Sequence, residues 1–167
     1  SEVKKEFLNR FISKPNSTLE LNFETPIVMG ILNVTPDSFY DGEESFSEKQ
    51  FVEKGLGLLK NGCRILDIGG ESTRPGAIEV LSSTEIERVV GVIEKIKKSV
   101  PSAIISVDTR KAVVAEKALQ SGASMVNDIS AGSFDKKMFG VVAKYKAGMC
   151  LMHSQGLPEN MQNKPNY

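Results

Sequence analysis

Short apolar runs alternate with amphipathic helical patterns along most of the chain, and this alternation limits the possible folds more than any other feature. Each run has the length of one strand and is apolar on both faces, as in parallel sheets that helices cover. A further alternating run, Thr18 to Phe23, indicates a small hairpin strand near the start. The predicted strands are 26–33, 63–68, 103–107, 124–129 and 149–153, and the predicted helices are 45–61, 82–99, 111–121 and 134–146.

The predicted helices carry start and stop residues at their ends. Ser47 with Gln50, and Ser82 with Glu85, have the spacing of a capping box at a helix N-terminus. Gly122 follows the third helix, in the position where a glycine commonly ends one. These signals favour an α/β chain whose helices pack on a sheet.

Two architectures share this order of elements. An open doubly wound sheet can be complete with five strands, whereas a (β/α)8 barrel needs eight units and typically about 250 residues. The chain has 167 residues and five predicted strands. It is therefore a complete open sheet or an incomplete barrel, and spacing along the chain does not decide between them.

Polar residues stand where each predicted strand ends. They are Asn33, Asp67 with Glu71, Asp108 with Thr109 and Arg110, Asn127 with Asp128, and His153. The carboxyl ends of parallel strands form the ligand site in α/β folds, so this repeated placement predicts one common site. Carboxylates accept hydrogen bonds and amides both donate and accept, which suits a flat heterocycle, a metal ion or a developing cation.

Composition excludes several other classes of function. Lys plus Arg and Asp plus Glu both number 21, which gives no electrostatic case for binding nucleic acid or an anionic membrane. No apolar run approaches the roughly 20 residues of a membrane span, and the charged start lacks the apolar run of a signal peptide. Cys63 and Cys150 lie in apolar strand patterns, and we expect buried, reduced thiols in a cytoplasmic protein. No zinc cluster, nucleophile elbow or Walker loop is present in the sequence.

Two loops have a specialised composition. The segment 35–42 places Phe39 between two acids, and the segment 71–76 contains Arg74 beside a proline. An arginine on such a loop commonly binds phosphate or carboxylate, although a surface salt bridge is an alternative from the residues alone.

Five segments resemble the signature sequences of the dihydropteroate synthases. They are Met29–Gly42 (MGILNVTPDSFYDG), Leu66–Ala77 (LDIGGESTRPGA), Ile105–Lys111 (ISVDTRK), Val126–Ile129 (VNDI) and Cys150–Gly156 (CLMHSQG). The resemblance implies a TIM-type (β/α)8 barrel rather than an open sheet. It also implies that residues 1–167 are a single, incomplete pterin-binding barrel domain with about the first five βα units, or about two thirds of the family's chain.

The resemblance further implies a transferase of folate biosynthesis. In that reaction 7,8-dihydropterin-6-ylmethyl diphosphate loses diphosphate, and the amine of p-aminobenzoate attacks the exposed methylene carbon to give 7,8-dihydropteroate. Mg²⁺ is the expected cofactor and assists the leaving group. The two substrates are the expected small-molecule partners, and sulfonamides, which resemble p-aminobenzoate, are expected to compete for its pocket.

Three residues receive the main roles from this resemblance. Asn33 is expected to bind Mg²⁺ or the diphosphate, because a hard cation accepts an amide oxygen as a ligand. Asp108 and Asn127 are expected to hold the pterin ring by hydrogen bonds. The carboxylate of Asp108 is also expected to stabilise a pterin-methyl cation after diphosphate leaves.

Further residues receive supporting roles. The resemblance places Thr73 near the diphosphate and the aminobenzoate, and Met152 against the pterin ring. The two loops are expected to close over the second substrate and to contribute Phe39, Asp41, Arg74 and Pro75, of which Asp41 and Arg74 join Asp108 as catalytic residues. We expect Asp67 and Glu71 to orient neighbouring side chains and His153 to be structural or secondary, and we assign no role to Arg110 or Asp128.

The family's barrel continues for about three further βα units, which carry an Asp, a Lys and an Arg/His pair for the substrates. We therefore expect the 167 residues alone to be inactive and poorly folded, since two strand edges and an apolar face are open. The longer protein is expected to be a homodimer. The alternatives are a non-catalytic pterin-binding fragment and the pterin-binding domain of a methyltetrahydrofolate methyltransferase, which is not expected to carry the 35–42 and 71–76 loops.

Overall fold

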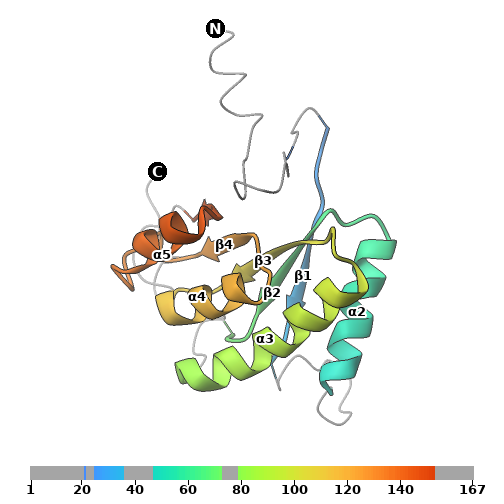
Figure 1. Cartoon of the computed structure of the whole chain (residues 1–167), viewed down its shortest axis with the longest axis horizontal. Coiled ribbons are helices and arrows are strands. Elements are labelled where there is room, and N and C mark those ends of the chain that lie inside the picture. The colour runs from blue at the N-terminus through green and yellow to red at the C-terminus, as the bar shows by residue number, and fades with distance from the viewer. Residues whose placement is uncertain (1–20, 22–24, 36–46, 73–78, 153–167) are drawn as a thin grey trace, which may run out of the picture.

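The computed structural model describes residues 21, 25–35, 47–72 and 79–152 of the chain (Figure 1). Five strands alternate with four helices in this part of the chain. The elements are β1 (Met29–Asn33), α2 (Glu48–Lys60), β2 (Ile65–Gly69), α3 (Ser82–Ser99), β3 (Ile104–Asp108), α4 (Ala112–Gln120), β4 (Met125–Asp128), α5 (Met138–Tyr145) and β5 (Gly148–Leu151). The predicted alternation is confirmed.

The order of the strands decides between the two candidate architectures. All four strand pairs are parallel, and the sheet order β1-β2-β3-β4-β5 follows the order of the chain. Helices α2, α3, α4 and α5 each contact the next and follow one another around one side of the sheet (Figure 1). A doubly wound sheet would reverse its strand order at a switch point and carry helices on both faces. The described sheet is therefore part of a (β/α) barrel.

The main core lies between the outer face of the sheet and the helices. Alternate strand residues such as Leu32, Ile68 and Val107 point to this layer and are fully buried. They pack against the apolar stripe of α3, represented by Val89 and Ile96. Burial of each such side chain stabilises the fold by roughly 1.5–3 kcal/mol, so this layer fixes the strands on which the site is built.

The inner face of the sheet is apolar at one end only. A small cluster at the amino ends of the strands consists of Leu21, Ile65, Ile104 and Met125. Leu21 is the one described residue of the predicted hairpin strand, whose remainder lies outside the described residues. Further along the same face, β2, β3 and β4 carry the polar side chains of Asp67, Ser106, Asp108 and Asn127, so the polar part of this face lies toward the carboxyl ends.

Local signals predicted some element boundaries and missed others. Helix α3 has the predicted bounds, and α2 begins after Ser47, whose backbone N–H donates to Gln50 Oε1 at 2.8 Å as expected for a capping box. Helix α5 begins at Met138, later than predicted, because Asp135 accepts hydrogen bonds from the backbone N–H groups of Ala112 and Lys137 and holds a turn there.

Two other expectations were wrong. The N-cap of α3 is Leu81, and Glu85 forms no capping box with Ser82 because its buried carboxylate binds residues after β3 instead. Cys63 and Cys150 are free thiols as expected, but Cys63 is half-buried and Cys150 is exposed. In the described part of the chain, no helix has the length and apolar character needed to cross a membrane.

Candidate functional site

Three predicted site residues lie in one row across the carboxyl ends of the strands. The parallel register pairs Asn33 with Gly69, Gly69 with Asp108, Asp108 with Asn127, and Asn127 with Cys150. Because residues paired in this way point to the same face, the row faces the inside of the barrel sector. The structure thus brings the strand ends of Asn33, Asp108 and Asn127 together in one row, while their role as one ligand site stays a prediction.

Gly69 keeps the row open between Asn33 and Asp108. A Cβ atom at this position would lie 3.5 Å from Asp108 Oδ2 and 3.7 Å from Asn33 Oδ1. Those distances are ordinary contacts, so a methyl group would fit and would fill the slot between the two polar side chains. Sequence reasoning did not single out Gly69; the signal was a glycine at the position where β1, β3 and β4 carry Asn33, Asp108 and Asn127.

A second polar layer lies directly beneath this row. Asp67 and Ser106 are register partners, with only 5% and 0% of their surfaces exposed. Asp67 Oδ2 accepts a hydrogen bond of 2.9 Å from Asn127 Nδ2. Among the described residues, Asp67 Oδ1 and Ser106 Oγ have no hydrogen-bond partner. The expectation that Asp67 orients a neighbour is therefore consistent with its contact to Asn127.

The carboxyl group of Asp108 is tuned to titrate near neutral pH. Burial, followed by the negative charges of Asp67, Glu85, Asp128 and Glu71, raises the pKa of Asp108 from 3.8 to about 7. Both effects disfavour the ionised form. At physiological pH the side chain therefore serves either as a hydrogen-bond donor or as a carboxylate, and a cationic ligand would favour the carboxylate.

A buried ion cluster flanks the row on the side of α3. The side chain of Lys111 is 5% exposed and donates to Glu85 Oε2 at 2.9 Å, to Glu71 and to the carbonyl oxygen of Val80. Burial lowers the pKa of Lys111, but the hydrogen bonds to Glu71 and Glu85 outweigh it and raise the pKa above its ordinary value. Thr109 Oγ1 also donates to Glu85 Oε1 at 2.6 Å. This cluster joins both ends of the 71–80 segment to α3 and β3.

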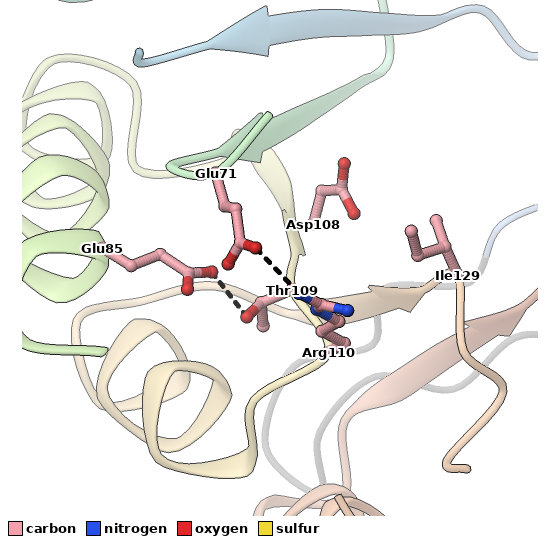
Figure 2. Close-up of a pocket in the computed structure, with 6 residues that line it drawn as sticks. All are labelled: Glu71, Glu85, Asp108, Thr109, Arg110 and Ile129. Atoms are coloured by element: carbon pink, nitrogen blue, oxygen red, sulfur yellow. Dashed lines mark hydrogen bonds and ion pairs between the residues drawn. The ribbon is translucent and has the colours of Figure 1, made fainter. Parts of the chain in front are cut away.

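Arg110 belongs to the same cluster and faces a small hollow. Its guanidinium lies 3.0 Å from Glu71 Oε1 and 4.2 Å above the centre of the Phe134 ring. Figure 2 shows the dashed contacts of Glu71 with Arg110 and of Glu85 with Thr109 at the edge of the hollow, which opens to solvent. The lining residues are Glu71, Glu85, Asp108, Thr109, Arg110 and Ile129.

Asp128, to which the sequence assigned no role, is structural. Its fully buried carboxylate accepts hydrogen bonds from the backbone N–H and the hydroxyl of Ser130 and from the backbone N–H of Gly132. These bonds, of 2.7 to 2.8 Å, close the turn after β4. Asp128 therefore supports the strand that carries Asn127.

Sequence reasoning also missed Glu85 and Lys111. Glu85 stands four residues before Val89 and on its face of α3, so it occupies a position in the buried stripe. A charged residue in an apolar stripe signals a buried ion that needs a partner. The partner Lys111 could not be identified from local sequence, because 26 residues separate the two.

The remaining predicted residues cannot be placed with the row. Phe39, Asp41, Thr73, Arg74, Pro75 and His153 lie outside the described residues. Met152 is half-buried and follows β5, where its backbone N–H donates to the carbonyl oxygen of Asp128 at 3.3 Å. Its contact with a pterin ring stays a prediction.

The described residues offer limited ligation for a metal ion. No group of three or more His, Cys, Asp and Glu side chains in the described part of the chain is arranged to hold one. Asn33 is an exposed residue at the end of β1, and an amide oxygen is a suitable single ligand for Mg²⁺, which commonly keeps several waters and binds substrate phosphates. One amide oxygen of this kind fits a magnesium ion that takes its other ligands from water or from phosphate groups.

Comparison with known proteins identifies a matching family. The family model described as pterin binding enzyme matches residues 29–167. The dihydropteroate synthase of Synechocystis sp. is 46% identical over 140 residues, which are 84% of this chain and 48% of that protein. The dihydropteroate synthase of Streptococcus pyogenes serotype M1 is 45% identical over 128 residues, 77% of this chain and 48% of that protein.

Solved structures agree with this result. The dihydropteroate synthase of Yersinia pestis, in a complex with a sulfonamide drug, has a TM-score of 0.83 and 41% identity, covering 95% of this chain and 56% of that one. The Burkholderia cenocepacia enzyme complexed with 7,8-dihydropteroate has a TM-score of 0.73 and 36% identity, covering 89% of this chain and 49% of that one. The chain thus spans about half the length of these relatives, less than the two thirds expected from the sequence.

Proposed function

This chain belongs to the family of pterin-binding enzymes, and we propose that it is part of a dihydropteroate synthase. The proposed reaction joins 7,8-dihydropterin-6-ylmethyl diphosphate to p-aminobenzoate. The observation that carries the proposal is the row of Asn33, Asp108 and Asn127 at the carboxyl ends of three strands of a barrel sector. We also propose that residues 1–167 belong to one pterin-binding domain.

The pterin ring is bound at Asp108 and Asn127. Both side chains are half-buried on the inner face of adjacent strands, and together they present carboxyl and amide groups to a flat heterocycle. The slot above Gly69 leaves the space between Asn33 and Asp108 open on this face of the sheet. The Burkholderia cenocepacia relative, complexed with 7,8-dihydropteroate, supports this ligand class.

Asp108 contributes electrostatic catalysis. The bond between the methylene carbon and the diphosphate oxygen breaks, and the electron pair leaves with the diphosphate. A carboxylate at Asp108 stabilises the positive charge that develops on the pterin-methyl group. The amine nitrogen of p-aminobenzoate then forms the new bond to the methylene carbon and releases a proton to solvent. The carboxyl group of Asp108 transfers no proton in these steps.

Asn33 is the residue that would hold Mg²⁺, through its amide oxygen. The ion supplies positive charge that assists departure of the diphosphate. Asn33 lies across the Gly69 slot from Asp108. The diphosphate end of the ligand is therefore proposed to lie near Asn33, apart from the pterin ring. Asn33 thereby orients the leaving group away from the strands that hold the pterin.

The second substrate is assigned to the loops. Thr73, Arg74 and Pro75, with Phe39 and Asp41, are proposed to enclose p-aminobenzoate and exclude water from the cation. Met152 is proposed as an apolar wall of the pterin pocket. Sulfonamides are proposed to compete with p-aminobenzoate, a proposal supported by the sulfonamide complex of the Yersinia pestis relative. A cytoplasmic homodimer is the proposed state of the protein.

A turnover assay on the complete protein tests this function. We expect formation of 7,8-dihydropteroate from the two substrates in the presence of Mg²⁺, and a loss of about a hundredfold or more in kcat/KM for Asp108→Ala. The matched control is Glu116→Gln, a partly exposed residue of α4 whose partners, Lys144 and Tyr145, lie on α5, away from the row. Pterin binding without any product would instead identify a non-catalytic pterin-binding protein.

A further inference from the structure

The side-chain amide of Asn127 is held in one of its two possible orientations. Its Nδ2 atom lies 2.9 Å from Asp67 Oδ2. The flipped amide would place its oxygen against a carboxylate oxygen, and two acceptors without a proton between them repel each other. The carbonyl oxygen of Asn127 is therefore the atom that remains for a ligand.

This orientation depends on a contact across the sheet. Asp67 lies on β2 and Asn127 on β4, so the hydrogen bond passes over β3 and joins residues that are 60 apart in the sequence. Asp67 reaches Asn127 from the layer beneath the row, where its register partner is Ser106. The contact therefore joins, through side chains, two strands that are not paired with each other.

The hydrogen bonding of Asp67 differs from that of a structural carboxylate in the same protein. Asp128 is fully buried, and both of its oxygens accept hydrogen bonds from the turn that follows it. Asp67 is almost as buried, but its Oδ1 atom has no partner among the described residues. An unpaired buried carboxylate oxygen is costly, so a role limited to folding does not account for it.

We propose that Asp67 is a positioning residue that fixes the Asn127 amide so that its carbonyl oxygen faces the ligand. This proposal rests on the proposed function and assigns a specificity to the site. A heterocycle is selected if it donates an N–H to Asn127, and an analogue with an acceptor at that position is rejected. Such selection is strong because a mismatched analogue leaves two acceptors facing each other.

Titration of pteroic acid into the complete protein tests the proposal. We expect Asp67→Ala to weaken binding at least about tenfold, because the amide loses its partner and no longer stays in one orientation. Asp67→Asn replaces the carboxylate by a side chain of the same shape whose amide oxygen accepts the same hydrogen bond. We expect this variant to bind within about threefold of the wild type.

A control and a spectroscopic readout separate positioning from packing. Ser106→Ala removes a buried hydroxyl from the same layer, next to Asp67, and is expected to leave the affinity unchanged. The ¹⁵N–¹H₂ resonances of the Asn127 side chain report the hydrogen bond directly. They should shift in Asp67→Ala and keep their wild-type positions in Asp67→Asn and Ser106→Ala.

Two results would overturn the proposal. One is an affinity of Asp67→Ala within about twofold of the wild type, and the other is an equal loss in all three variants. If the wild-type protein does not bind pteroic acid at all, the proposed function fails. The Asn127 resonances then still decide the positioning role, since their shift in Asp67→Ala supports it and unchanged positions contradict it.

Discussion

At the scale of single residues, Asp108 shows how one side chain is tuned by the surrounding charges. Burial and four neighbouring carboxyl groups raise its pKa to about 7. Because the folded protein binds this proton more tightly than the unfolded chain, the ionisation of Asp108 opposes folding as the pH rises from about 4 to about 7. A cationic ligand is favourable for the same reason, since its positive charge stabilises the ionised form of the buried carboxyl group.

The variant Asp108→Asn removes this ionisation and tests the linkage. We expect it to gain stability over the wild type, and to gain more at about pH 8 than at about pH 5, because only at the higher pH is the wild-type carboxyl group charged. Urea unfolding midpoints of both proteins at the two pH values provide the comparison. An equal gain in stability at both pH values would mean that Asp108 titrates in its ordinary range.

At the scale of elements, the buried ion cluster fastens the segment after β2 to α3 and to the start of α4. We expect Lys111→Met to destabilise the protein by about 3–5 kcal/mol, because it leaves Glu71 and Glu85 without their shared cation. Lys144→Met is the control, since the exposed pair of Lys144 with Glu116 is expected to contribute nothing measurable. Equal unfolding midpoints for the two variants would contradict the role of the cluster.

The packing of α2 against the sheet gives a second prediction at this scale. A Cβ atom at Gly55 would lie 2.7 Å from Ile96 Cδ1 and 3.2 Å from Leu32 Cδ2, whereas one at Gly57 would meet nothing within 4 Å. We expect Gly57→Ala to stabilise the helix by up to about 1 kcal/mol and Gly55→Ala to lose about 1–3 kcal/mol through overpacking. Thermal unfolding distinguishes them, and a gain in both would show that the interface is loose.

The elements also show what local sequence can determine. The bounds of α3 follow from its apolar stripe, and the row of Asn33, Asp108 and Asn127 follows from polar residues at strand ends. The partners of Glu85 and the contact of Asp67 with Asn127 did not follow, because they join residues 24 to 60 positions apart. Sheet register brings Asp67 close to Asn127, and the packing of α3 on the sheet brings Glu85 to its partners, so both contacts arise only in the assembled fold.

At the scale of the whole molecule, the described sheet is an open sector with the candidate site on its inner face. Ile31 is 65% exposed on that face of β1, between the apolar cluster at one end and Asn33 at the other. An exposed apolar side chain on an inner face, together with the open edges of β1 and β5 in the described sheet, supports the expectation that these 167 residues alone fold poorly and do not catalyse the reaction.

That expectation has a direct check. We expect the 167-residue chain to bind a hydrophobic dye and to associate at micromolar concentration, whereas the complete protein does neither, because further barrel units cover the inner face. Dye fluorescence and sedimentation velocity measure the two properties. A monomeric 167-residue chain that binds no dye and forms dihydropteroate would contradict it.

The proposed function depends above all on a pterin ring being held at the carboxyl ends of β3 and β4. Isothermal titration of 7,8-dihydropterin into the complete protein and into Asn127→Ala measures this binding, with Glu116→Gln as the unaffected control. We expect saturable binding with one ligand per chain in the wild type, and a loss of at least about tenfold in affinity for Asn127→Ala alone. Equal affinities in all three proteins would contradict the assignment and would locate the pterin elsewhere.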